Sequence, residues 1–144
     1  MPGPRGDFRL HKALDDRIAV LKLVPGTDPG LLRLMVDAEY HAIIIEGYGA
    51  GGAPNHASPK DFLPALSYAA EKGVRIICTT QCVYDGAHLD TYETGIMAMQ
   101  KGALSGGRLH LELLVPAIML ALGRSRERSA MEAYLKKVEQ DIFQ

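Results

Sequence analysis

Two short runs of consecutive apolar residues constrain the fold of this chain more than any other feature. The first is Ala42–Ile45, with the sequence Ala-Ile-Ile-Ile, and the second is Val74–Cys78. Short β-branched runs without polar alternation are typical of strands that are buried on both faces. Such strands occur almost only in parallel sheets whose two faces are covered by helices. The two runs therefore predict an α/β fold with a parallel sheet.

The segments around these runs complete an alternating order of strands and helices. Arg17–Val24 is a third strand candidate, because apolar side chains crowd a short run that ends at Pro25. Units of about 25–35 residues suit right-handed strand–helix–strand crossovers. We therefore expect an open parallel sheet of about four strands with helices on both faces, a flavodoxin-like three-layer sandwich. Helices are expected over residues 28–39, 58–73, 91–101 and 125–143, a helix or strand–helix hybrid over 109–122, and a turn at 105–107.

Two of the expected helices begin at residues that are common at helix starts. Asp28 precedes Pro29, and Ser58 precedes Pro59. An aspartate or serine side-chain oxygen caps free backbone N–H groups, and proline is favoured at the first helical position. Pro64 then falls in the second turn of its helix, where it is expected to blunt the helix start.

Length and charge favour one folded domain and exclude some kinds of partner. The 144 residues suit a single domain, with residues 1–16 expected to be a polar tail or interdomain linker and residues 17–144 the folded part. Lys and Arg number 16 against 17 Asp and Glu, so the net charge is −1. No nucleic-acid partner is expected, because phosphate binding requires a basic surface. With no membrane-spanning or signal-like stretch apparent, we expect no membrane partner and a cytoplasmic location.

A run of glycines follows the first buried strand. Gly47, Gly49 and Gly52 fit the dinucleotide-binding spacing, in which the glycines open a helix and an acidic residue follows about 20 residues later. Here residues 53–57 separate the glycines from the next expected helix, and residues 66–70 contain no acid. We therefore expect a turn that requires glycine, or a backbone-lined cradle for a small polar ligand, rather than a nucleotide site.

Glu46 and two cysteines lie at or near the ends of the buried runs. A carboxylate at the position of Glu46 needs either a salt bridge or a ligand, and both interpretations stay open. Cys78 is expected to be a buried apolar residue, whereas Cys82 lies in a loop and can line a pocket. A nucleophilic Cys82 would need His56 or His88 as its base. Without further cysteines or histidines at matching spacing, we expect no metal and no cofactor.

The run Leu111–Leu122 is apolar nearly all round. A helix of this kind is buried, or it covers a partner. We expect half of it to lie in the core and the rest to form a subunit or domain contact, which a charge at Leu114 should disturb.

Four segments together resemble one known domain. They are Leu23–Gly26, Ile44–Asn55, Thr80–Cys82 and Tyr92–Gly95. In this combination they resemble the C-terminal domain of the L-asparaginase family, most closely that of the cytoplasmic type I enzymes. The same domain type occurs in the asparaginase-like subunit of archaeal glutamyl-tRNA(Gln) amidotransferase. The resemblance covers residues 17–123, nearly the whole of the expected folded part.

The resemblance implies an amidohydrolase that uses threonine to convert asparagine to aspartate and ammonia. The family's nucleophiles lie in Thr-Gly-Gly-Thr and Gly-Thr-Asp-Thr motifs of an N-terminal domain, and neither motif occurs here. The stretch Gly26–Pro29 is interpreted as structural. We therefore expect no catalytic residue in this chain and no activity from it alone. Its expected roles are dimerisation, closure of the active site and effector binding, with a second copy, the catalytic domain and a small amino acid such as asparagine as partners.

The resemblance also implies a ligand site. In type I enzymes the tyrosine–glycine loop and the Thr-Gln-Cys segment border a second, allosteric asparagine site. Glu46 stands where that pattern has arginine, and Gly52 stands where it has asparagine. An arginine would bind the carboxylate of an amino acid, whereas a glutamate repels it. A cationic or amine ligand therefore fits better at Glu46 than asparagine does. An alternative is a stand-alone small-amino-acid binding module or an oligomerisation module. The expected ligand-binding residues are Glu46, Gly47, Tyr48, Gly49, Gly52, Thr80, Gln81 and Cys82.

Overall fold

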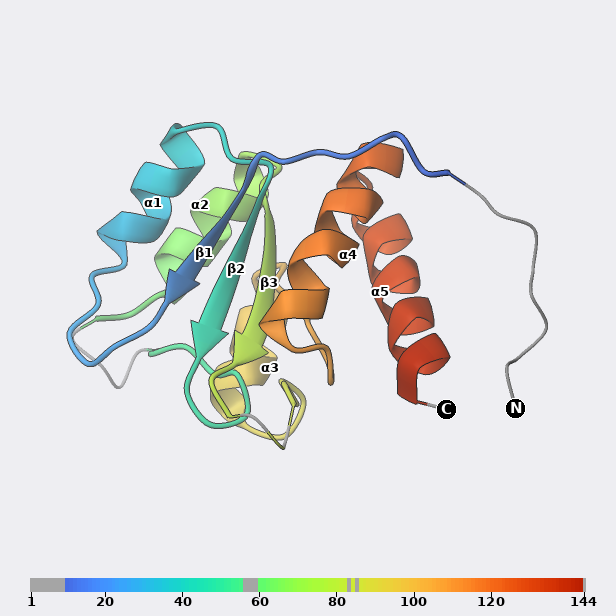
Figure 1. Ribbon diagram of the computed structural model, residues 1–144. Helices are drawn as coiled ribbons and strands as arrows, with labels where there is room; N and C mark the ends of the chain where they lie inside the picture. Colours follow the sequence, from blue (N-terminus) through green and yellow to red (C-terminus); the bar gives the residue numbers. More distant parts are fainter. Residues whose placement is uncertain (1–9, 56–59, 83, 85, 144) are drawn as a thin grey trace.

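The computed structural model describes residues 10–55, 60–82, 84 and 86–143, and it contains one parallel sheet (Figure 1). The expected α/β architecture is confirmed. The strands follow one another in chain order without a reversal, so all their carboxyl ends lie at one edge of the sheet. The strands are β1 (Ile18–Lys22), β2 (Ala42–Gly47), β3 (Arg75–Thr80) and β4 (Leu104–Ser105).

Five helices cover the two faces of the sheet within the described residues. The first three belong to the connections between successive strands, and crossovers of one hand in one direction place them on the same face. The last two pack on the opposite face, which gives three layers (Figure 1). None of the described helices has the length and apolar character needed to cross a membrane. The helices are α1 (Gly30–Asp37), α2 (Leu63–Glu71), α3 (Glu93–Gln100), α4 (Leu111–Arg124) and α5 (Arg128–Phe143).

β2 is the centre of the core, as its sequence predicts. Ile43 and Ile45 pack into the layer with α1, α2 and α3, while Ala42 and Ile44 pack into the layer with α4 and α5. All four side chains are 0% exposed. A strand buried on both faces has no solvent-facing position, and this explains the absence of alternation.

Two expectations about local structure are wrong. The second helix begins at Leu63 and not at Ser58, which lies outside the described residues together with Pro59. The Asp61 side chain takes the place expected of Ser58, since its Oδ1 accepts the Leu63 N–H at 2.9 Å. Pro64 sits within the first two helical positions, where a backbone N–H would have no partner inside the helix. Ser105 was expected in a turn but ends β4, opposite Cys78 in the register of β3.

Other boundaries differ by a few residues. The first helix begins at Gly30, whose N–H is capped by the Asp28 carboxylate at 2.8 Å. The uncertain segment 109–122 is helical from Leu111 onward, with Pro116 inside the helix. The last helix begins at Arg128.

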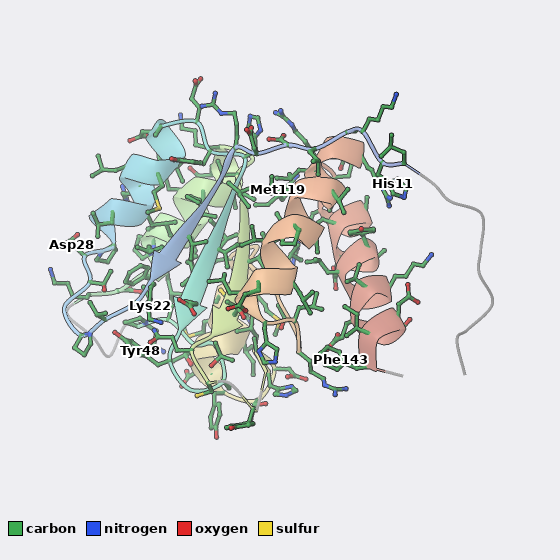
Figure 2. All side chains as sticks on the ribbon, in the orientation of Figure 1. His11, Lys22, Asp28, Tyr48, Met119 and Phe143 are labelled. Carbon is green, nitrogen blue, oxygen red and sulfur yellow. The ribbon has the colours of Figure 1, made fainter. Side chains whose placement is uncertain are left out.

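Residues 10–16 have no regular secondary structure and run past the end of α4 (Figures 1 and 2). The Asp15 N–H donates to the Met119 carbonyl at 3.1 Å, and a Cβ on Gly123 would overlap the carbonyl oxygen of Ala13. The Asp15 carboxylate lies 2.8 Å from His41 Nδ1 and 3.6 Å from Arg126 Nη2. The role of this segment as a tail or linker stays a prediction, but its last residues pack on the domain.

Because of the ion pairs of Asp15, we expect the stability of the fold to decrease at acidic pH. Burial raises the pKa of Asp15, but the Arg17 N–H and the positive charges of His41 and Arg126 outweigh it, so the pKa lies below its usual value of 3.8. A lowered folded-state pKa means that the carboxylate stabilises the fold above the unfolded-state pKa. This stabilisation is lost as the pH falls through the folded-state pKa.

We expect Asp15→Asn to lower the free energy of unfolding at pH 7 by about 1–3 kcal/mol, because hydrogen bonds to a charged group are lost. Urea denaturation between pH 7 and pH 3 measures the difference from the unmodified chain. The difference should shrink below pH 4, as the native carboxylate itself becomes protonated. A difference that stays constant down to pH 3 contradicts this assignment.

α4 has a buried side and an exposed side, and the sequence assigned one residue to the wrong side. Leu114 is 0% exposed and packs with Ile44 and Ile77, so it belongs to the core and not to a contact surface. Leu113, the preceding residue, is 41% exposed. A charge at Leu114 would disrupt folding whatever the partner, so a contact surface must be tested at Leu113.

We expect Leu114→Ala to lower the free energy of unfolding by about 2–5 kcal/mol, because it leaves a cavity between α4 and the sheet. Leu113→Ala removes the same atoms from the exposed side and should change it by less than about 1 kcal/mol. Urea denaturation of both variants measures the contrast. Equal losses would mean that α4 does not pack as described.

Candidate functional site

The glycine run forms a tight turn at the carboxyl end of β2. Tyr48 and Gly52 face each other in an antiparallel bridge, with both N–H to carbonyl distances at 3.1 Å. Gly49 and Gly51 have φ values of 49° and 93°, in the left-handed region that favours glycine. The turn does not open a helix, which confirms the expected turn and removes the basis for a nucleotide site.

Two further glycines are required by close packing. A Cβ on Gly47 would lie 2.5 Å from the Gly52 carbonyl oxygen, and a Cβ on Gly52 would lie 2.7 Å from Thr94 Oγ1. Real Cβ atoms essentially never come this close to another heavy atom. Gly52 therefore lets the turn close against the first residues of α3, and the asparagine of the type I pattern would collide with Thr94.

The residues that follow β3 hold this turn in place. Thr80 Oγ1 donates to the Gly49 carbonyl and accepts the Cys82 N–H at 2.9 Å. The Gln81 carboxamide donates from Nε2 to the carbonyls of Leu23, at 2.7 Å, and Glu46, at 3.0 Å. These bonds join the ends of β1 and β2 to the segment after β3. The side-chain polar groups of Thr80 and Gln81 thus form hydrogen bonds within the protein.

Glu46 has a partner within the sheet. Its side chain is 13% exposed, and its Oε2 lies 3.4 Å from Nζ of Lys22, the residue opposite it on β1. Lys22 and Tyr48 both lie at the carboxyl end of the sheet (Figure 2). Of the two interpretations of Glu46, the salt bridge is therefore present, and the binding of a ligand stays a prediction.

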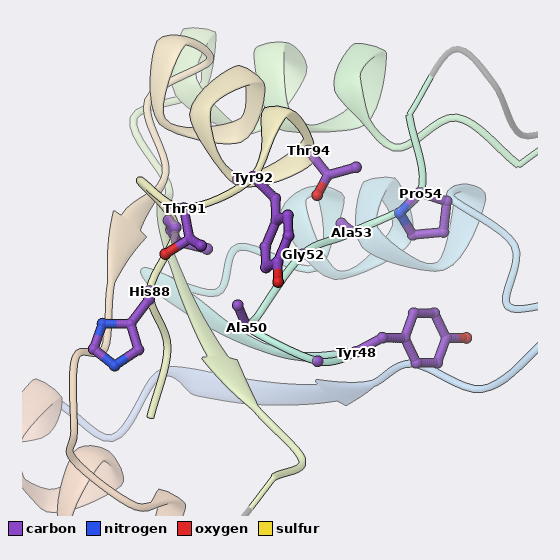
Figure 3. Close-up of a pocket in the computed structure, with 12 residues that line it drawn as sticks. Tyr48, Ala50, Gly52, Ala53, Pro54, His88, Thr91, Tyr92 and Thr94 are labelled. Atoms are coloured by element: carbon purple, nitrogen blue, oxygen red, sulfur yellow. The ribbon is translucent and has the colours of Figure 1, made fainter. Parts of the chain in front are cut away.

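A pocket of about 720 Å³ opens between the glycine turn and the start of α3. We call it the large pocket. The side chains of Tyr92 and Thr94 lie close together over Gly52, while the Tyr48 ring points away from them (Figure 3). Its lining residues are Tyr48, Gly49, Ala50, Gly52, Ala53, Pro54, His88, Leu89, Thr91, Tyr92, Thr94 and Gly95.

The expected ligand-binding residues are divided between this pocket and a second one. Tyr48, Gly49 and Gly52 line the large pocket. A smaller pocket, of about 230 Å³, lies on the α4 side, and Gly47 lines neither of the two. The small pocket is lined by Glu46, Thr80, Gln81, Cys82, His110, Leu111 and Glu112.

Four polar or aromatic residues of the large pocket are not among the expected ligand-binding residues. His88, Thr91, Tyr92 and Thr94 come from the segment before α3 and from its first turn. The Tyr92–Gly95 motif, which contains two of these residues, is the sequence signal that could have identified them. In the structure, Gly95 packs so closely on Leu89 that a Cβ on Gly95 would overlap the Leu89 backbone. That contact places the motif at the pocket.

Within the residues that the structure describes, the two cysteines are not arranged for catalysis or metal binding. Cys78 is completely buried, as expected, and burial raises the pKa of its thiol to about 12. Cys82 lines the small pocket and His88 the large one, so the structure does not bring them together as nucleophile and base. His56 lies outside the described residues. Within the described ranges, no group of three or more His, Cys, Asp or Glu is placed to hold a metal ion.

We expect Gln81→Glu to lower the free energy of unfolding by about 2–3 kcal/mol. The change keeps the shape of the side chain but replaces the two N–H bonds to Leu23 and Glu46 with a carboxylate that faces two carbonyl oxygens. Gln140→Glu, on the exposed side of α5, is the matched control and should change stability by less than about 0.5 kcal/mol. Chemical denaturation of both variants measures the effect, and equal losses would contradict the role of Gln81.

Comparison with known proteins places this chain and its fold in one family. The family model described as the glutaminase/asparaginase C-terminal domain matches residues 17–135. A glutamyl-tRNA(Gln) amidotransferase subunit from Thermococcus kodakarensis is 35% identical over 99 residues, which is 69% of this chain and 21% of the relative. L-asparaginase from the same organism is 33% identical over 137 residues, which is 95% of this chain and 40% of the relative.

Solved structures agree with this placement. The thermostable L-asparaginase from Thermococcus kodakarensis has a TM-score of 0.78 and 30% identity, over 91% of this chain and 41% of that chain. L-asparaginase I from Vibrio cholerae has a TM-score of 0.79 over 94% of this chain and 40% of that chain, and at 24% identity it supports the fold alone. This chain thus covers 21% and 40% of the two curated relatives. It belongs to the glutaminase/asparaginase C-terminal domain family.

Proposed function

We propose that this domain works in an amide-hydrolysing enzyme of the asparaginase type, which converts asparagine to aspartate and ammonia. In that enzyme the domain closes one side of the active site with its large pocket. The observation that carries the proposal is the position of this pocket at the carboxyl ends of the strands, where parallel sheets bind ligands, in a chain of this family.

The nucleophile of this enzyme comes from another domain. Thr91 and Thr94 line the large pocket, but within the described part of the chain neither hydroxyl has a hydrogen bond to a base. A threonine nucleophile requires such a base, or an equivalent means of activation. The chain also contains neither Thr-Gly-Gly-Thr nor Gly-Thr-Asp-Thr. The chain alone is therefore inactive.

The domain also contributes to a homodimer. The exposed side of α4 carries Leu113, next to apolar residues that are only partly buried, and apolar surface of this kind suits a subunit contact. Light scattering should show a larger species for the unmodified chain than for Leu113→Glu. If both have the mass of a monomer, α4 has no role in self-association.

The enzyme works in the cytoplasm, where the free thiols of Cys78 and Cys82 stay reduced.

A stand-alone module that binds a small amino acid has less support. The expected ligand residues are divided between two pockets, and Glu46, Thr80 and Gln81 already have partners inside the protein. One observation favours an amine ligand, because Glu46 and Glu112 both line the small pocket. Effector binding at these residues is the part of the proposal that depends on this pocket.

The direct test replaces the matching domain of Thermococcus kodakarensis L-asparaginase with this whole chain. We expect ammonia release from asparagine by the chimaera and none by the chain alone, because only the chimaera has the catalytic threonines. A chimaera that folds but releases no ammonia contradicts the proposal. If the chain alone then binds asparagine in titration calorimetry, the binding module is the better explanation.

A further inference from the structure

Residues 10–16 lead into β1 and lie across the end of α4, at the edge of the sheet opposite the glycine turn (Figure 1). We call them the entry segment. They have no regular secondary structure, and such segments near the end of a chain are ordinarily poorly ordered unless specific contacts hold them. In this chain, specific contacts do hold the entry segment.

Two side chains of the entry segment fasten it to the domain. The Asp15 carboxylate is 14% exposed and pairs with His41, which precedes β2, and with Arg126, which follows α4. Arg124 Nη2, in the last turn of α4, donates to the His11 ring, whose Nδ1 lies 2.9 Å away. The entry segment is thus joined to the end of α4 and to the start of the central strand.

Gly123 indicates that the sequence of α4 is adapted to this packing. A glycine weakens a helix relative to alanine, yet Gly123 lies within the last turn of α4. Its φ is not in the left-handed region, so the backbone conformation does not require glycine. A Cβ on Gly123 would overlap the carbonyl oxygen of Ala13. The close packing of the entry segment therefore explains the glycine.

The entry segment exposes two large apolar side chains while it is held in this way. Leu10 is 65% exposed and Leu14 is 58% exposed. Scattered leucines on a protein surface are common and require no partner. These two differ because the contacts described above fix the segment that carries them, so less conformational entropy is lost when they meet a partner. The entry segment is therefore suited to contact another protein surface.

We propose that Leu10 and Leu14 pack against the catalytic domain of the proposed enzyme, and that Asp15 is the positioning residue that holds the entry segment for this contact. The position along the chain identifies the partner, because the family model describes a C-terminal domain and begins at residue 17, directly after the entry segment. The match to Thermococcus kodakarensis L-asparaginase covers 137 of the 144 residues, so it includes the entry segment. This inference rests on the proposed function, since the partner is the domain that supplies the nucleophile.

The first test compares melting temperatures of the whole chain alone and of the chimaera with the catalytic domain of Thermococcus kodakarensis L-asparaginase. Leu10→Gln and Leu14→Gln should change the melting temperature of the chain alone by less than about 2 °C, because both side chains are exposed. In the chimaera we expect each to lower the melting temperature of this domain by about 3 °C or more, because an apolar contact is lost. Leu34→Gln on α1, where the leucine is also 65% exposed, is the matched control and should have no effect in either protein.

The second test measures trypsin cleavage after Lys12 in the chain alone. We expect Asp15→Asn to be cleaved about tenfold faster than the unmodified chain, because the entry segment is released. Asp16→Asn should be cleaved at the unmodified rate, since the Asp16 side chain accepts no hydrogen bond from a described residue. Leu114→Ala weakens the core but not the entry segment, so it controls for the loss of overall stability.

Three results overturn the inference. The first is a melting temperature of the chimaera that responds to Leu10→Gln and Leu14→Gln no more than to Leu34→Gln. The second is cleavage after Lys12 that is as fast in the unmodified chain as in Asp15→Asn. The third is a smaller mass of the glutamine variants of the chain alone in light scattering, because the partner would then be a second copy. An inactive chimaera whose melting temperature still depends on Leu10 and Leu14 would contradict the proposed function but keep the contact.

Discussion

The hydrogen bonds that leave the end of β3 are the interaction on which the rest of the site depends. Gln81 donates to the carbonyl of Leu23, directly after β1, and to that of Glu46 in β2, and Thr80 donates to the glycine turn. Three neighbouring strand ends are thereby fixed to one another. Because the turn is fixed, Gly52 can meet Thr94 at close range, and the large pocket opens between them. Thr80 and Gln81, which were expected to contact a ligand, thus stabilise the turn that forms one side of the large pocket.

The sequence predicts the centre of the fold better than its edges. β2 and β3 are buried on both faces, so their composition alone identifies them. β4 has two residues, Leu104 and Ser105, and such a short strand leaves no pattern, because its position depends on pairing with β3. The start of α2 was misplaced for a related reason. Ser58-Pro59 and Asp61 both satisfy the local rules for a helix start, and only tertiary packing selects between them.

The candidate site was predicted in outline but divided incorrectly. A residue at the end of a strand must lie at the carboxyl edge of the sheet, and all eight expected residues do so. The sequence does not indicate on which side of the turn each side chain lies. Glu46, Thr80 and Cys82 line the small pocket near α4, whereas Tyr48 and Gly52 line the large pocket. Thr94 was missed because its role depends on a contact with a residue 42 positions earlier in the chain, Gly52.

The end of β3 holds the glycine turn in the shape that forms the large pocket. Hydrogen exchange at the amides of Gly51 and Gly52, both bonded to the Tyr48 carbonyl, measures this in the unmodified chain and in Thr80→Val. We expect both amides to exchange about five- to tenfold faster in the variant, while the amide of Ile44 in β2 keeps its protection. Equal exchange rates at Gly51 and Gly52 in the two proteins would contradict a role of Thr80 in holding the turn.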